Sequence, residues 1–182
     1  GHKEILIQTD NEVSITSFIM ALKKKTNTSI LYRTSPNYSS ASLVVGEGIH
    51  AILGRMFRAN KAALEKRLGT TIGKSDQMVD WLIRYSAWAR TRFNIGDDGM
   101  SPYERTFGTP YKHEVCEFGE HVMVRLQGEE NEKFASKWTR GIWVMKSELN
   151  DEHLVRTSGG TVSSRTIHRL VSDRRWNLEV YK

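Results

Sequence analysis

Two acidic residues, Asp10 and Glu47, have the types and spacing that could bind a divalent metal ion. Asp10 ends the apolar run "EILIQTD", and 36 residues separate it from Glu47. Two carboxylates held close together repel unless a cation lies between them, and hard oxygen ligands favour Mg²⁺ or Mn²⁺. Such a cation can activate water or a hydroxyl and stabilise a leaving oxygen at phosphorus. The alternative is a turn-forming Asp and a Glu that only complements a helix dipole.

The elements around these acids predict how they could meet. "EILIQTD" is typical of a strand, "SITSFIMALKKKT" of an amphipathic helix and "TSILYRTSP" of a second strand ended by proline. A long helix is predicted from Val44 to Leu68, with Glu47 near its start. Because ligands gather at the carboxyl ends of strands in open α/β sheets, a helix returning from the second strand can bring Glu47 beside Asp10.

The rest of the chain divides into a helical part and a β-rich part. "SDQMVDWLIRYSAWARTRF" predicts another helix, with Trp81, Tyr85 and Trp88 in the core rather than stacked on bases. After about Glu114, short β-rich runs such as "HVMVRL" and "RGIWVMK" alternate with polar or glycine turns, which favours a small all-β module. We therefore predict two domains, residues 1–112 and 113–182. Trp138 and Trp143 are expected in the core or at the rim of the second domain.

Composition limits the classes of function. No apolar run approaches the ~20 residues of a membrane span, so we expect no membrane partner. The single cysteine, Cys116, forbids an internal disulfide and favours a buried thiol in a reducing compartment, the nucleus or the cytoplasm. The net charge is +6, and all of the excess lies in residues 1–112, with sixteen basic and ten acidic residues. This excess is consistent with a polyanion such as DNA, or simply with solubility.

The order of several motifs resembles a known family. "IQTDNE", then "TSP" at 34–36, then "VVGEGIHAILGRMFR" resembles the second half of a retroviral-type integrase catalytic core, nearest to copia-like LTR-retrotransposon Pol polyproteins. The stretch "WLIRYSAWARTRFNIGDDGMSPYERTFGTPY" is similar to the closing segment of that core. "FGEHVMVR", "KWTRGIWVMK" and "GTVSSRTIHRL" resemble the small β module that follows it.

The resemblance implies a fold and a chemistry. It implies an incomplete ribonuclease-H-like α/β core over residues 1–112, followed by an SH3-like β module over 113–182. Asp10 and Glu47 match the second and third acids of the family's Asp–Asp–Glu metal triad, which catalyses DNA integration by polynucleotidyl transfer. The first Asp belongs to an upstream strand. We therefore expect Mg²⁺ or Mn²⁺ to bind only if that residue is supplied, and we expect this chain alone to be inactive.

The resemblance also suggests partners and an alternative. Arg55, Arg58 and Lys61 follow Glu47 on the same predicted helix and are candidate contacts to DNA phosphates; a solvated helix face is the alternative. Transposon ends and target DNA, the rest of a polyprotein and a homo-oligomer are the expected partners. Arg125, Arg140, Arg165 and Arg169 could add phosphate contacts, although a module of net zero charge could instead bind protein.

Two departures keep a second function open. Glu12 stands where the family usually has glycine, and Gly48 stands where a basic residue is common. These changes fit a catalytically dead transposon remnant that acts as a DNA-binding or protein-interaction module.

Overall fold

The structure is a computed structural model that describes residues 3–9, 12–34, 44–126, 136–177 and 179; for residues 44–47 it describes the backbone alone. By contacts the chain forms two compact units, Gly1–Ile52 and Leu53–Lys182, and each is described by itself. The predicted division at 112/113 stays a prediction. Within the described residues, no helix is long and apolar enough to cross a membrane.

The first unit is built on a β–α–β motif. Strand β1 (Glu4–Thr9) leads into helix α1 (Val13–Lys25) and strand β2 (Ser29–Thr34), and the two strands pair in parallel. Side chains alternate along each strand. On one face of the sheet Ile30 of β2 is buried, as is Ile19 of α1. On the other face Leu6 and Leu31, which pair in register, stay exposed. Among the residues that the structure describes, one face of the two-stranded sheet is therefore covered and the other is bare. The unit ends within helix α2 (Val44–Leu68).

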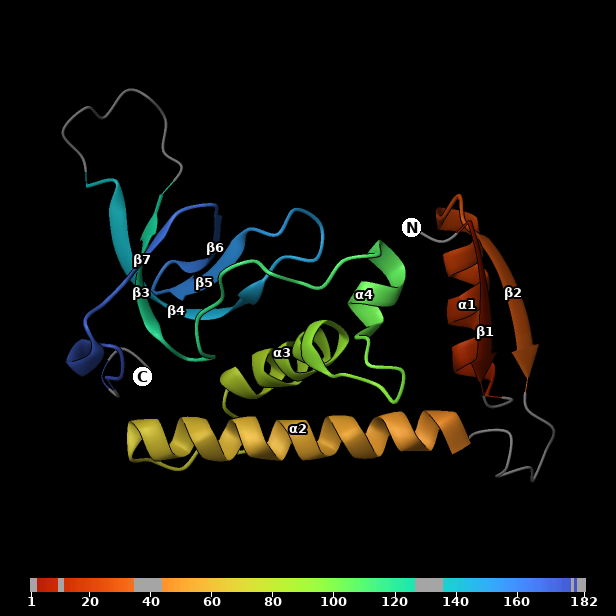
Figure 1. The fold of residues 1–182 in the computed structure, drawn as a ribbon, viewed down its shortest axis with the longest axis horizontal. Coiled ribbons are helices and arrows are strands. Elements are labelled where there is room, and N and C mark those ends of the chain that lie inside the picture. The colour runs from red at the N-terminus through yellow and green to blue at the C-terminus, as the bar shows by residue number, and fades with distance from the viewer. Residues whose placement is uncertain (1–2, 10–11, 35–43, 127–135, 178, 180–182) are drawn as a thin grey trace. The chain divides into compact units, whose positions relative to one another are not determined.

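The second unit joins helices to a five-stranded sheet. It contains α2 from Leu53 on, α3 (Met78–Phe93) and α4 (Pro102–Phe107). The strands are β3 (His121–Arg125), β4 (Trp138–Lys146), β5 (His153–Thr157), β6 (Gly160–Ser164) and β7 (Ile167–Arg169). A short 3₁₀ helix, η2, follows at Ser172–Arg174. The sheet is antiparallel with the order β6-β5-β4-β3-β7 (Figure 1).

An aromatic core holds the second unit together. The rings of Trp88 on α3 and Trp143 on β4 meet edge to face at 6.2 Å, and Tyr85 packs against both. Leu64 of α2 joins the same cluster, and Asn60 Nδ2 donates a hydrogen bond to Ser86 Oγ at 3.1 Å. The sequence-based placement of Tyr85, Trp88 and Trp143 in the core is confirmed. Trp138 lies half-buried outside it.

The expected fold class is confirmed at the level of a mixed α/β chain that ends in an antiparallel sheet. The five elements from β1 to α3 also follow the predicted order. Cys116 is buried as predicted, and burial raises the pKa of its thiol to about 12, which keeps it protonated. The finer descriptions, ribonuclease-H-like and SH3-like, stay predictions.

Candidate metal centre and nucleic-acid interface

The parallel pairing of β1 and β2 fixes which edge of the first unit can hold the predicted site. Thr9 pairs with Thr34, so both strands end at the same edge, and Asp10 is the residue that follows β1. Asp10 itself lies outside the described residues. Glu47 lies in the first turn of α2, and its side chain also lies outside them. The pairing of these two acids therefore stays a prediction.

Hydroxyl groups gather at the same edge of the first unit. Thr16 Oγ1 on α1 and the Tyr32 hydroxyl on β2 lie 2.9 Å apart, and Thr9 Oγ1 lies 3.3 Å from the same Tyr32 oxygen. The hydroxyl of Ser14 donates to Glu12 Oε1 at 2.8 Å. Glu12, which follows Asp10 by two positions in the sequence, is thus an exposed residue at the start of α1 and makes its own local contact.

The three cations predicted to contact DNA differ in their surroundings. Arg55 and Arg58 are exposed on α2, and neither forms an ion pair with any residue that the structure describes. Lys61 Nζ instead lies 2.7 Å from Glu65 Oε1, which also accepts a hydrogen bond from the Ile72 amide. These contacts lower the pKa of Glu65, the bond from Lys61 most of all. Lys61 would have to give up this ion pair to bind a phosphate, so Arg55 and Arg58 are the stronger candidates.

The arginines of the β-rich region also separate into two groups. Arg169 makes two 2.7 Å bonds to the fully buried carboxylate of Glu120, and Arg165 lies 3.4 Å from Glu152. Arg125 and Arg140 are exposed and form no ion pair with a described residue. Internal ion pairs therefore use two of the four arginines that the sequence suggested for phosphate contacts.

In the described part of the chain, no group of three or more His, Cys, Asp or Glu side chains could hold a metal ion. Sequence reasoning missed one feature, a pocket beside β3 and η2 that includes the buried ring of His121. The alternation of "HVMVR" places His121 on the face opposite Val122 and Val124. Only the fold shows that residues near 140 and 174 line the same pocket.

Comparison with known proteins adds a distant likeness to a solved structure. No protein-family model matches the sequence, and no curated protein matches it. Among solved structures, the chain is similar to one in the cryo-EM structure of a simian T-cell lymphotropic virus intasome in complex with PP2A regulatory subunit B56 gamma, with 14% sequence identity and a TM-score of 0.43. The match covers 93% of this chain and 59% of that chain, so the chain spans less than two thirds of the length of the protein it resembles. At this identity and TM-score the likeness carries no argument about function.

Proposed function

We propose that this chain is part of a retrotransposon integrase of the copia-like kind, which binds DNA and contributes two metal ligands, Asp10 and Glu47, to polynucleotidyl transfer. The observation that carries the proposal is the parallel β1–α1–β2 unit. Its register supports an acid directly after β1 at the edge where ligands gather in open α/β sheets. The helical first turn of α2 supports Glu47 as an acid that begins a helix.

The two carboxylates would have a defined role. Asp10 and Glu47 would hold Mg²⁺ or Mn²⁺ through their oxygen atoms, together with an acid from an upstream strand. The bound ions would supply activation of the attacking hydroxyl and stabilisation of the leaving oxygen of a DNA phosphodiester. Arg55 and Arg58 would orient the DNA by binding phosphates without reading its sequence.

A metal titration of a longer protein that includes the upstream strand and its Asp tests this proposal. Because an ion that binds only the folded state raises its stability, Mg²⁺ should raise the melting temperature of this protein with its wild-type residues. The double variant Asp10→Asn, Glu47→Gln should not respond. Glu12→Gln, which removes a neighbouring acid outside the pair, should respond like the wild type. An equal response of all three proteins would remove the metal site from the proposal.

A strand-transfer assay distinguishes an active enzyme from a catalytically dead remnant. A longer protein that includes the upstream strand and its Asp should transfer DNA strands in Mg²⁺, and the same protein with Glu47→Gln should not. If the longer protein binds DNA but is inert, the alternative of a catalytically dead DNA-binding or protein-interaction module replaces the enzyme.

A further inference from the structure

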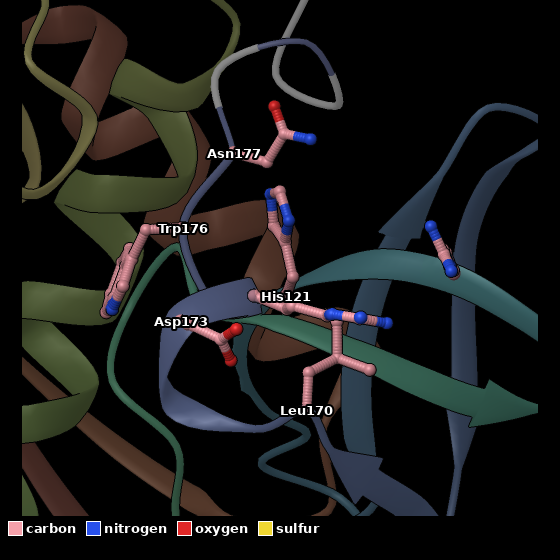
Figure 2. Close-up of a pocket in the computed structure, with 7 residues that line it drawn as sticks. His121, Leu170, Asp173, Trp176 and Asn177 are labelled. Atoms are coloured by element: carbon pink, nitrogen blue, oxygen red, sulfur yellow. The ribbon is translucent and has the colours of Figure 1, made fainter.

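A pocket lies beside the five-stranded sheet, within the second unit. It measures about 520 Å³ and is lined by His121, Arg140, Leu170, Asp173, Arg174, Trp176 and Asn177. This volume is in the range of small-ligand sites. Figure 2 shows the imidazole of His121 projecting toward Asn177 and away from the carboxylate of Asp173. The lining residues come from β3, β4 and the segment around η2, so the fold brings together parts of the chain about fifty residues apart.

The cations of this pocket are free to bind a ligand. Neither Arg140 nor Arg174 forms an ion pair with a described residue, whereas the nearby Arg169 and Arg175 both contact Glu120. Two guanidinium groups and the carboxylate of Asp173 give the lining a formal charge of +1 when His121 is neutral. Residues 113–182 have zero net charge, but the pocket has a local excess of positive charge, because several acids of this region are used in internal ion pairs.

His121 supplies an independent sign of a missing partner. Its side chain is 4% exposed, and its Nε2 atom makes no hydrogen bond with any described residue. Burial, followed by the charge of Arg140, lowers the pKa of this imidazole, which keeps the ring neutral at pH 7. Buried polar atoms without a partner are uncommon in folded proteins because the lost hydration is costly. A ligand oxygen that enters the pocket could provide the missing hydrogen bond.

We propose that the pocket is a phosphoryl-binding site, in which Arg140, Arg174 and the ring of His121 bind the oxygen atoms of a singly charged phosphodiester. Guanidinium groups suit phosphate oxygens because their N–H groups form paired, charge-assisted hydrogen bonds. The tetrahedral group offers oxygens in several directions, which matches donors that come from three separate elements. Its single negative charge matches the +1 lining, whereas a second charge would be opposed by Asp173.

The neighbouring sheet face favours a nucleic-acid strand as the source of this group. Val122 and Val124 face the core, so Met123 and Arg125 face outward, and Arg125 pairs across the sheet with Trp138. The half-buried Trp138 ring lies 4.4 Å from the exposed His168 ring. Aromatic rings interleaved with arginines are typical of surfaces that bind single strands. The proposal does not use Asp10 or Glu47, so it can succeed or fail independently of the metal site.

Titration of the full chain with dimethyl phosphate, a minimal phosphodiester, tests the site. Imidazole ¹H–¹⁵N spectra should show a saturable change in the His121 signal that sodium chloride at equal ionic strength does not produce. Arg140→Gln and Arg174→Gln should each weaken this binding about tenfold, because each removes charge-assisted hydrogen bonds. Arg165→Gln is the matched control: it removes an equal charge from an arginine whose side chain is 84% exposed, and it should leave the affinity unchanged.

Two further measurements identify the source of the phosphodiester and define the results that would overturn the proposal. A single-stranded oligothymidylate that displaces dimethyl phosphate would identify nucleic acid as the source of the phosphodiester; no displacement would identify a small molecule that carries a phosphodiester. The variant His121→Gln identifies the imidazole signal, which should be missing from its spectrum. If His121→Gln does not fold, Arg174→Gln keeps the test available because Arg174 is exposed. The proposal is overturned if dimethyl phosphate and the oligonucleotide both leave the His121 signal unchanged, or if Arg165→Gln weakens binding as much as Arg140→Gln.

Discussion

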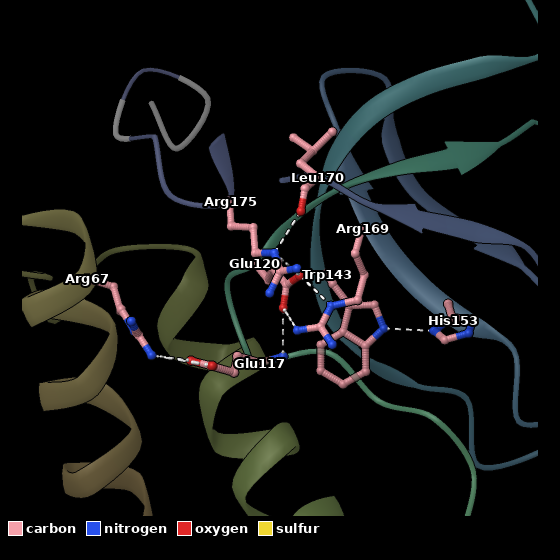
Figure 3. Close-up of polar contacts among 8 residues, drawn as sticks. All are labelled: Arg67, Glu117, Glu120, Trp143, His153, Arg169, Leu170 and Arg175. Carbon is pink, nitrogen blue, oxygen red and sulfur yellow. Dashed lines mark hydrogen bonds and ion pairs between the residues drawn. The ribbon is translucent and has the colours of Figure 1, made fainter. Parts of the chain in front are cut away.

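His153 is a buried hydrogen-bond acceptor whose protonation should destabilise the sheet. Its Nδ1 accepts a 3.0 Å bond from Trp143 Nε1 (Figure 3), and burial lowers the pKa of His153 to about 4. An unfolded histidine titrates near 6.5, so the unfolded chain binds the proton first. The free energy of unfolding should therefore fall as the pH drops from about 6.5 to about 4, by at most ~1.4 kcal/mol per pH unit from this group. Urea unfolding at several pH values measures it.

A substitution isolates the contribution of His153 from that of other groups. Burial also lowers the pKa of His121, which adds to the same trend. His153→Gln keeps an acceptor for Trp143 but cannot be protonated, so its stability should depend less on pH than that of the wild type over this window. Equal pH dependence of the two proteins would show that His153 does not carry the effect. Near-ultraviolet circular dichroism checks that the Trp143 environment is retained.

At the scale of elements, Glu120 links the start of β3 to the end of the sheet. Its buried carboxylate makes two 2.7 Å bonds to Arg169 of β7 and lies 3.5 Å from Arg175 (Figure 3). Removing one partner of a buried ion pair leaves the other charge without compensation, and this costs about 3–5 kcal/mol. We expect Glu120→Gln to lower the free energy of unfolding by roughly this amount, measured by urea denaturation.

The turn before β3 contains a matched control for this prediction. Glu117 lies 3.2 Å from Arg67, but both side chains are more than half exposed, and such pairs contribute little to stability. Glu117→Gln should therefore change the urea midpoint far less than Glu120→Gln. Similar losses in both variants would mean that burial does not determine the strength of these pairs.

These elements also show what the sequence could and could not reveal. Periodicity predicted α2 from Val44 to Leu68 because local spacing marks an amphipathic helix, and the structure has the same bounds. The bond from Glu120 to Arg169 joins residues 49 positions apart, and no local pattern indicates it. For the same reason the pocket around His121 was not predicted: its donors come from segments that only the sheet topology brings together.

At the scale of the whole molecule, the two candidate metal ligands, Asp10 and Glu47, belong to the smaller of the two units, Gly1–Ile52. Sequence spacing was sufficient to propose Asp10 and Glu47 because a strand end and a helix start are local features. It could not show that Lys61 is held by Glu65, since that contact depends on side-chain conformations on α2. Nor could it show that Arg165 and Arg169 serve internal ion pairs. Residue type alone therefore overestimated the number of cations available to DNA.

The two units should differ in local stability, because they differ in how much apolar surface they bury. In the described part of the first unit, β1 and β2 form a sheet of only two strands, and Leu6 and Leu31 remain 60% and 49% exposed. A two-stranded sheet is marginal without further strands or packing on its faces. The second unit instead surrounds Trp88 and Trp143, which are 1% and 0% exposed.

Amide hydrogen exchange of the intact chain should therefore show faster exchange in β1 and β2 than in β3, β4 and β5. Equal protection in both sets of strands would contradict this, and would imply that the bare face of the first unit is covered in solution.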